Sequence, residues 1–387
     1  MAYQNVGTPR FYVNVYEYLE AIGAISIGDS VRYLRTNPTE TFIQKTHTDN
    51  DGFNDVSLLP NCPIAWKDLA GDKGFVALLG HNMAACNAQV LLSEGTPDYT
   101  SMQGITGIVN YAHVNGILSP EYDGFTIWTG DFTPFDQLGG NERTMQLRWE
   151  SGQNWNEIDP NPYNGTDLKC NSIVIGNYYD MPHSPDLSLK LTYEYDGVKT
   201  QQTKGGATLS NAIYTKPPDW GILNTGIYEQ YPRTLGCWGL EHPTDNRATA
   251  PNYRSGRRVW DLSFSYLSDT DVFPLNASSG YAATIGSESG YPDGSIVQVS
   301  GAGTATTTDD SYEFTSNIID GTDFFSRVWN RVMGGHLPFI FNPSGGGTSP
   351  NNNPDQFAIC RFDMDSLQYD QVAHNAYNVK LKIREVW

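Results

Sequence analysis

The chain has 387 residues, too many for one ordinary core, and this length predicts two or three domains. Aromatic residues make up 12% of it, with 38 Gly and 22 Pro, which favours short strands joined by turns and excludes a disordered chain. The 24 basic and 43 acidic residues give a net charge of −19, which argues against a protein that coats nucleic acid, because phosphate contact needs basic clusters.

The N-terminus lacks the basic and apolar regions of a signal peptide, and no run approaches the ~20 apolar residues of a membrane span. We therefore expect no membrane contact. The cysteines are scattered without a Cys-x-x-Cys spacing, which predicts buried free thiols in a reducing cytoplasm, not a disulfide framework or a zinc site. They are Cys62, Cys86, Cys170, Cys237 and Cys360.

The first ordered segment covers residues 11–27 and mixes two periodicities. One periodicity is the alternation of a strand and the other is that of a short helical turn. The secondary structure of this segment therefore stays open. The alternating residues are Phe11, Val13 and Val15, and the helical ones are Tyr18, Leu19 and Ile22. Strand material broken at Pro38 follows over residues 31–43.

Residues 46–55 have the composition of a turn, and we interpret them as the entrance to a second domain. Asp49, Asp51 and Asp55 surround Gly52 and form a weak candidate for calcium, since carboxylates at alternate positions can surround a hard cation. The bidentate Glu of a calcium loop is missing downstream. A solvated linker is the more frequent meaning of such a sequence, and we expect no bound metal or cofactor.

Residues 58–215 are predicted to be all-β, because short apolar runs alternate with turn residues. Strands at this spacing are typical of a sandwich or a barrel. His81 follows the first buried strand, where a lone histidine usually satisfies local backbone groups. Asp196-Gly197 is a hairpin turn signal after the last strand. The predicted strands are residues 75–80, 88–92, 105–109, 124–128, 144–149, 172–175 and 187–195.

The chain then returns to a second body through residues 214–251, which are rich in Pro, Gly and Trp. A half-buried strand is predicted where apolar residues alternate with Asp261, Ser263 and Ser265. Its apolar members are Trp260, Leu262, Phe264 and Tyr266. Arg254, Arg257 and Arg258 precede it, and we interpret them as a solvated strand start and not a phosphate site. Residues 276–310 form a low-complexity arm or loop.

The C-terminal seventy residues carry the clearest pattern. Apolar residues between 324 and 333 recur on one stripe and predict a helix, with Arg327, Asn330 and Arg331 on the opposite face and Gly334-Gly335 as its left-handed stop. Buried strands are predicted at 337–341 and 356–363. The last predicted strand alternates between two sides. Tyr377, Val379, Leu381 and Ile383 face one side, and Asn378, Lys380, Lys382 and Arg384 face the other.

Two sets of residues resemble known families. Residues 75–83, with Gly80-His81-Asn82 after a buried strand, and residues 172–176, with an Ile-x-Ile-Gly pattern, resemble discoidin-type, galactose-binding-like β-sandwiches of phage tail proteins. This resemblance covers residues 56–215 and implies a jelly-roll sandwich. The candidate glycan-facing residues of such a module are Trp128, Tyr178 and Tyr179, although packing on the barrel or on neighbouring subunits is the more frequent role of such aromatic residues.

The second set comprises residues 258–264, 324–333, 337–343 and 383–387. Their order of elements is similar to the split barrel of tailed-phage distal tail and tail-tube-related proteins. The resemblance implies a ring-forming barrel domain with one packed α-helix, built from residues 1–50 and 225–387 around the sandwich inserted at 56–215. The residues expected in its core or oligomer contacts are Trp260, Phe264, Phe325, Trp329, Phe339, Phe341 and Ile383.

Catalytic signatures are weak. The sequence has neither a Gly-x-Ser-x-Gly elbow nor a phosphate-binding loop, and spacing singles out no carboxylate pair, Glu121 with Asp123 included. We therefore expect no enzymatic activity in this mainly β chain. The resemblance implies a structural virion protein that is made in the host cytoplasm and forms a distal tail or tail-tip ring of six copies in the tail.

The partners that this resemblance implies are the tail tube, the hub, the fibres and, only in passing, the DNA. A carboxylate-rich wall would let that DNA pass without binding, with Asp363, Asp365 and Asp370 as candidates for such a surface. The alternative function is receptor recognition through a host glycan, which the discoidin-like block would supply.

Overall fold

A computed structural model of the chain describes residues 6–25, 34–36, 43–45, 54–58, 66–81, 88–93, 102–106, 108–110, 117–120, 124–133, 146–151, 168–170, 172–194, 198–212, 257–274, 321–352 and 356–386. The predicted mainly β class is confirmed. The predictions for residues 276–310, the whole return segment 214–251, Arg254 and three of the cysteines (Cys62, Cys86 and Cys237) lie outside the described residues.

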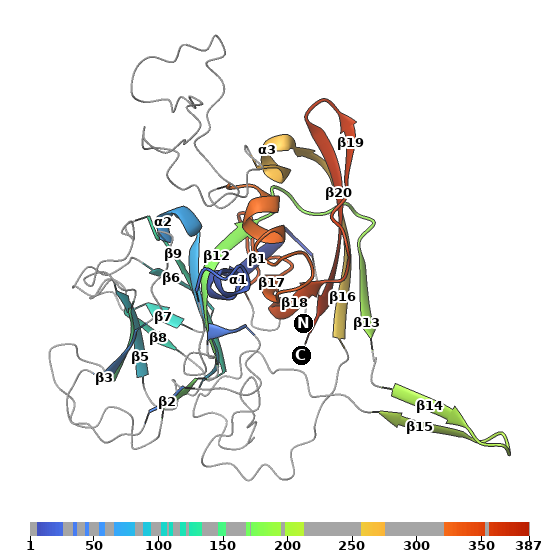
Figure 1. The fold of residues 1–387 in the computed structure, drawn as a ribbon, viewed down its shortest axis with the longest axis horizontal. Helices are drawn as coiled ribbons and strands as arrows, with labels where there is room; N and C mark the ends of the chain where they lie inside the picture. The colour runs from blue at the N-terminus through green and yellow to red at the C-terminus, as the bar shows by residue number, and fades with distance from the viewer. Residues whose placement is uncertain are drawn as a thin grey trace.

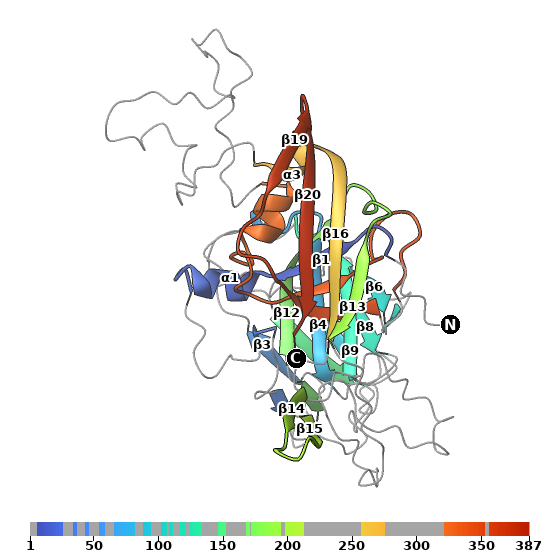
Figure 2. The same ribbon diagram turned by 90° about the vertical axis from the view of Figure 1, so that its right-hand side faces the viewer.

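An eleven-stranded antiparallel sheet organises the described structure (Figure 1). Figure 2 shows three strands at one end of this sheet, β20, β16 and β13, side by side. From one end to the other the order is β13 (Lys190–Glu194), β16 (Arg257–Ser268), β20 (Ala376–Glu385), β18 (Ala358–Phe362), β17 (Phe339–Asn342), β1 (Arg10–Asn14), β12 (Ser172–Asp180), β4 (Gly74–His81), β9 (Gly124–Gly130) and β6 (Met102–Thr106), with β19 (Tyr369–Ala373) paired to β20.

Three smaller sheets complete the β structure of the described residues. A five-stranded sheet lies on the β4–β9 side of the molecule, and one two-stranded hairpin projects away from the body (Figure 1). The five strands are β3 (Asn54–Leu58), β10 (Gln146–Ser151), β5 (Ala88–Ser93), β8 (Ile117–Pro120) and β7 (Ile108–Asn110). The two pairs are β11 (Leu168–Cys170) with β2 (Ile43–Lys45), and β14 (Val198–Gln202) with β15 (Thr208–Ala212).

Helical segments among the described residues are short: α1 (Val15–Ala21), α2 (Trp66–Leu69), α3 (Asp269–Val272) and a π-helical turn, η5 (Phe325–Trp329). The mixed periodicity of residues 11–27 is explained by a strand that runs directly into α1. Asn14 ends β1 and caps α1, because its side-chain oxygen accepts hydrogen bonds from the backbone N–H groups of Tyr16 and Glu17.

Strand β1 separates two hydrophobic cores. Side chains alternate across a strand, so Phe11 and Val13 enter one core while Tyr12 enters the other. The larger core joins β1 to the C-terminal strands and includes Trp260, Phe264, Phe324, Val328, Phe339, Phe341 and Ile383. The smaller core joins β1 to the middle of the chain and includes Phe75, Leu79, Phe125, Val174, Ile340 and Phe357.

The division into a barrel domain and a sandwich inserted at residues 56–215 stays a prediction. The sheet shows that β12 from the middle segment is hydrogen-bonded to β1, and that β13 from the same segment is hydrogen-bonded to β16. Strands from both predicted domains are therefore neighbours in one sheet. The predicted hairpin at Asp196-Gly197 is wrong, because β13 pairs with β16 while β14 pairs with β15.

The helix predicted at 324–333 is replaced by a shorter π-helical turn, η5. This turn is wider than an α-helix. Hydrogen bonds from Asn330 N to Phe325 O, 2.8 Å, and from Gly334 N to Trp329 O, 3.0 Å, span five residues. The apolar stripe is confirmed at Phe324, Val328 and Val332, which are buried, and the left-handed stop is confirmed at Gly334, whose φ is +67°. Phe325 and Trp329 are only half-buried, and Met333 is exposed.

The other C-terminal strands follow the predicted alternation with one exception. On β20, Val379, Leu381 and Ile383 are buried while Lys380 and Lys382 are exposed. On β16, Tyr266 is 77% exposed because a bulge shifts the register between Phe264 and Leu267, and Leu267 takes the inward position. The prediction for Tyr266 is therefore wrong, since one extra residue reverses the alternation.

Strands β1 and β12 approach each other closely at Gly176 of β12. A Cβ at this position would lie 1.9 Å from the backbone oxygen of Val13, and backbone cannot move aside without breaking the ladder. We predict that Gly176→Ala lowers the free energy of unfolding by about 1–3 kcal/mol, as overpacking does elsewhere. Urea unfolding measures it. The control Gly205→Ala, whose Cβ would meet only Thr203 Oγ1 at 4.0 Å, should be neutral. Equal stability of the two variants would contradict the close approach.

Candidate functional site

Two buried arginines connect three distant segments. The sequence predicts Arg327 and Arg331 on the face opposite the apolar stripe. Both are buried, and each donates from Nη1 to the backbone oxygen of Leu69, the last residue of α2. Arg331 also donates to Asn177 Oδ1, and Asn177 Nδ2 donates to Arg327 O at 3.2 Å. The turn η5 is thereby held against β12 and α2.

Sequence reasoning missed this arginine cluster because its acceptors are backbone and amide oxygens far away in sequence. The spacing of four residues between Arg327 and Arg331 was visible and indicates one shared helical face. Nothing in the sequence identified Leu69 or Asn177 as the groups that this face meets.

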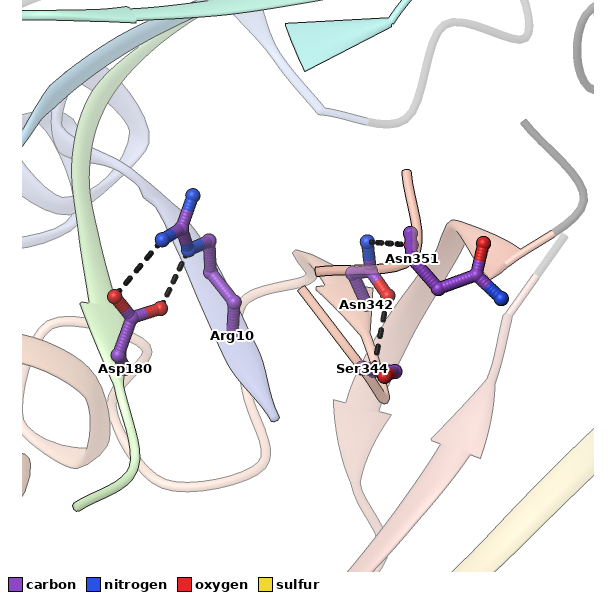
Figure 3. A network of polar contacts seen from close by, with 5 residues as sticks. All are labelled: Arg10, Asp180, Asn342, Ser344 and Asn351. Carbon is purple, nitrogen blue, oxygen red and sulfur yellow. Dashed lines mark hydrogen bonds and ion pairs between the residues drawn. The ribbon is translucent and has the colours of Figure 1, made fainter. Parts of the chain in front are cut away.

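A second polar site lies where β1 begins (Figure 3). Arg10 and Asp180 are directly opposite on β1 and β12, and two parallel hydrogen bonds join them, with 2.9 Å between Nη2 and Oδ2. The guanidinium carbon also lies 4.3 Å from the ring centroid of Tyr178. Burial opposes the charge of Arg10, but the bond to Asp180 outweighs it, so the pKa of Arg10 is raised. This pair locks the register of β1 against β12.

The loop after β17 is folded by the side chain of Asn342, also drawn in Figure 3. Asn342 Nδ2 donates to Asn351 O at 3.0 Å, and its Oδ1 accepts from Ser344 N at 3.0 Å. Gly346 N donates to Thr8 O at 2.9 Å, which ties the loop to the residues before β1. The loop after β17 is therefore an ordered turn beside Arg10.

A buried ion pair joins β16 to the end of β20. Arg258 and Glu385 are both less than a tenth exposed, with Nη2 3.0 Å from Oε1, and Arg258 Nη2 also donates to Phe357 O at 2.9 Å. The pKa of Arg258 is raised, because the neighbouring Glu385 carboxylate outweighs burial. The prediction of a solvated strand start is wrong for Arg258, since Glu385 lies beside it only after β16 and β20 have paired.

Glu17 forms a fourth polar site, which pins residues 34–36 onto α1. Its Oε2 accepts from Thr36 Oγ1 at 2.6 Å and from Asn14 Nδ2 at 3.3 Å, and Asn14 Nδ2 also donates to Leu34 O at 2.7 Å. Burial raises the pKa of Glu17 to about 7, while the bond from Thr36 opposes the shift. The ionised carboxylate is therefore disfavoured inside the fold at neutral pH.

His81 and the described cysteines are enclosed. His81 is fully buried, its Nε2 lies 3.2 Å from Thr126 Oγ1, and burial lowers the pKa of His81 to about 3. It contacts a side-chain hydroxyl, and its expected role of satisfying local backbone groups stays a prediction. Cys170 and Cys360 are free and buried, as predicted for these two, and burial raises the pKa of both thiols.

The residues expected in the core divide into two groups. Trp260, Phe264, Phe339, Phe341 and Ile383 are buried in the larger core, as predicted. The half-buried Trp329 packs at its edge, 5.2 Å from the ring of Phe362.

The candidate glycan-facing residues are not exposed as a group. Trp128 and Tyr179 are buried, so the expectation that they face solvent is wrong. Tyr178 is half-buried, and the guanidinium of Arg10 lies over its ring. A sugar ring needs a free aromatic face, which the two buried side chains do not offer.

The metal candidate is only partly described. Asp55 lies in β3, while Asp49 and Asp51 are outside the described residues. Within the described part of the chain, no three His, Cys, Asp or Glu side chains are grouped so that they could hold a metal ion. No described helix combines the length and apolar character needed to cross a bilayer.

The outer face of the C-terminal strands carries mixed charge. Lys382 on β20 pairs with Asp363 at 2.6 Å, and Arg384 pairs with Glu194 of β13 at 3.0 Å. Lys380 lies on the same face. Asp363 therefore sits among basic residues, and the role of Asp363, Asp365 and Asp370 along a DNA path stays a prediction.

Apolar side chains are exposed at two places at this end of the sheet. Tyr193 of β13 is 46% exposed, and Leu187, just before β13, is completely exposed. Val198 and Leu209 are exposed on the projecting hairpin. Such residues at a strand edge are suited to contact with another protein surface.

Comparison of the chain with protein-family models, with curated proteins and with solved structures gives no match.

The carboxyl of Glu17 predicts a specific pH dependence. Its folded pKa of about 7 lies above its ordinary value of 4.5, so its contribution to stability is complete below pH 4.5 and is lost as the pH rises to 7. Glu17→Gln removes this loss. We predict that the variant gains about 3 kcal/mol relative to the wild type between pH 4.5 and pH 7, measured by urea unfolding across that range.

The matched control is Glu20→Gln, which replaces a partly exposed carboxyl on the same helix that pairs with Arg35. This variant should change the free energy of unfolding by less than about 1 kcal/mol. The change should not increase between pH 4.5 and pH 7. Parallel profiles for wild type and Glu17→Gln would contradict the buried carboxyl.

Proposed function

We propose that this chain is a structural subunit of a tailed-bacteriophage virion. It would form a distal tail or tail-tip ring that joins the tail tube to the tip or the fibres. The observation that carries the proposal is the open end of the large sheet at β13, which pairs only with β16 among the described residues. An unpaired strand edge attracts other strands, and closing a ring of subunits removes it.

Side chains at this edge support contact with another protein chain. Tyr193 and Leu187 are exposed apolar residues at β13, and apolar side chains at a strand edge are suited to contact with another chain. A second copy of the chain is the simplest partner, because identical subunits offer the same edge repeatedly and a rotation can close the series.

The order of strands supports the split barrel implied by the resemblance. Strands β16, β20, β18, β17 and β1 are consecutive in the sheet, and η5 packs on their shared core. The five-stranded sheet drawn entirely from residues 54–151 supports an inserted jelly-roll sandwich. The ring order of six, the partner tail proteins and the transient passage of DNA follow from the resemblance and belong to the same proposal.

The burial of Trp128 and Tyr179 removes two of the three candidate glycan-facing residues of the receptor-recognition alternative, so the ring is the function that we propose.

Native mass spectrometry and negative-stain imaging of the purified chain test the proposal. We predict a closed ring for the wild type. The double variant Leu187→Lys/Tyr193→Lys should dissociate it, because two lysines at the β13 edge oppose strand addition. The matched control Tyr266→Lys/Val372→Lys adds the same charge at exposed positions on β16 and β19 and should still assemble. A monomeric wild type would contradict the proposal, and equal behaviour of the two variants would exclude the β13 edge.

A further inference from the structure

The open edge strand β13 has a self-complementary sequence. Its residues are Lys190, Leu191, Thr192, Tyr193 and Glu194, and among the described residues it pairs with β16 alone. Figure 2 shows β13 beside β16 at this end of the sheet. A basic residue begins the strand, an acidic residue ends it and a threonine lies at its centre. An antiparallel copy of the same strand therefore places the opposite charge at each end.

The two charged side chains lie on one face of β13 and remain open to a further partner. Side chains alternate across a strand, so Lys190, Thr192 and Glu194 share this face. Lys190 is exposed and makes no ion pair with any described residue, although Asp261 of β16 lies opposite it. Glu194 pairs with Arg384 through Oε2, and its side chain stays 36% exposed. A carboxylate accepts more than one donor, so Glu194 has capacity for a second cation.

The other face of β13 ends an apolar layer. Leu191 lies opposite Trp260 and packs against the larger core, and Tyr193 next to it on this face is 46% exposed. A further strand at this edge that carries apolar side chains on the same face would extend the layer and cover Tyr193. A second copy of β13 carries such side chains.

One antiparallel register satisfies both faces. Pairing centred on Thr192 places Lys190 opposite Glu194, Leu191 opposite Tyr193, and Thr192 opposite its own copy. All five residues then have a partner. A shift by one residue places charged side chains opposite apolar ones, and a shift by two breaks both charge pairs. The sequence of β13 therefore specifies the register as well as the partner.

We propose that β13 pairs antiparallel with β13 of a second copy of this chain, about a two-fold axis at Thr192, so that the sheets of two subunits become continuous. This inference rests on the proposed function, which assigns self-assembly to this edge, and adds the strand, its direction and its register. The contact is isologous, so it joins two copies and uses both open edges. A ring of six is then built from three such pairs, with a second contact between pairs.

The two-fold axis makes each cross-strand interaction occur twice. Each pair of subunits contains two contacts of Lys190 with Glu194 and two of Leu191 with Tyr193. Opposite charges and aromatic residues directly across an antiparallel pair stabilise it, whereas like charges there destabilise it. A single reversal of charge in the chain therefore creates two like-charge contacts in the pair of subunits.

Mixing two charge variants tests this register. Lys190→Glu and Glu194→Lys each place like charges opposite each other when they pair with themselves, so each alone should self-associate at least about tenfold more weakly than the wild type. In a mixture of the two, opposite charges face each other at both sites again. The mixture should therefore associate within about threefold of the wild type. Sedimentation velocity over a concentration series measures the dissociation constants.

Matched controls make the same charge changes away from β13. Lys380→Glu on β20 and Asp72→Lys in the turn before β4 replace exposed residues, and each should self-associate like the wild type. Because Glu194→Lys also removes the pair with Arg384, near-ultraviolet circular dichroism of every variant is compared with that of the wild type. A matching spectrum shows that the fold of the subunit is retained.

A cysteine at the centre of β13 tests the two-fold axis independently of charge. Residues directly opposite each other have Cβ atoms roughly 4.5–5.5 Å apart, close to the spacing of a disulfide, so Thr192→Cys should give a covalent dimer on mild oxidation. The control Lys190→Cys should not, because the two copies of residue 190 are four residues, roughly 13 Å, apart along the strands. The wild type gives the background from its native cysteines.

The outcomes distinguish this inference from the proposed function. A wild type that stays monomeric at every concentration would overturn both. Assembly of the wild type without rescue in the mixture of charge variants, or with cross-linking of Lys190→Cys in place of Thr192→Cys, would overturn the self-pairing of β13 and leave the proposed function standing.

Discussion

The position of β1 between β12 and β17 is the constraint on which the described structure depends. Hydrogen bonds on both sides of this one strand unite the middle and C-terminal segments of the chain in a single sheet. Its alternate side chains also enter both cores, Phe11 and Val13 on one face and Tyr12 on the other. The close approach at Gly176 is possible only because that residue of β12 has no Cβ.

Polar contacts at both ends of β1 make its register specific. A slip of one residue would exchange the two faces and place Tyr12 where Phe11 belongs. The bidentate pair of Arg10 with Asp180 would be lost by such a slip, and so would the cap that Asn14 provides to α1. Buried polar groups are costly without partners, so these bonds favour one arrangement of the strands over its alternatives.

The same sheet is the basis of the assembly that we propose. Its interior strands are paired on both sides, whereas β13 at its end retains an unpaired edge within the described structure, and the projecting hairpin begins a few residues further along the chain. Contact between copies would cover the open edge, which is the physical basis of the proposed ring.

The sequence by itself determined the features that depend on local periodicity. The alternation of β20, the buried run of β17 and the left-handed stop at Gly334 each require only neighbouring residues. The mainly β class followed from the abundance of aromatic and turn residues for the same reason.

Only the tertiary structure decided the partners of these elements. Arg258 and Arg331 are polar by any sequence measure, yet both are buried because Glu385 and Leu69 O reach them from distant segments. Trp128 is buried by neighbouring strands, and the bulge before Leu267 turns Tyr266 outward. Periodicity describes which side of its own strand a residue occupies. It does not describe what the rest of the chain places on that side.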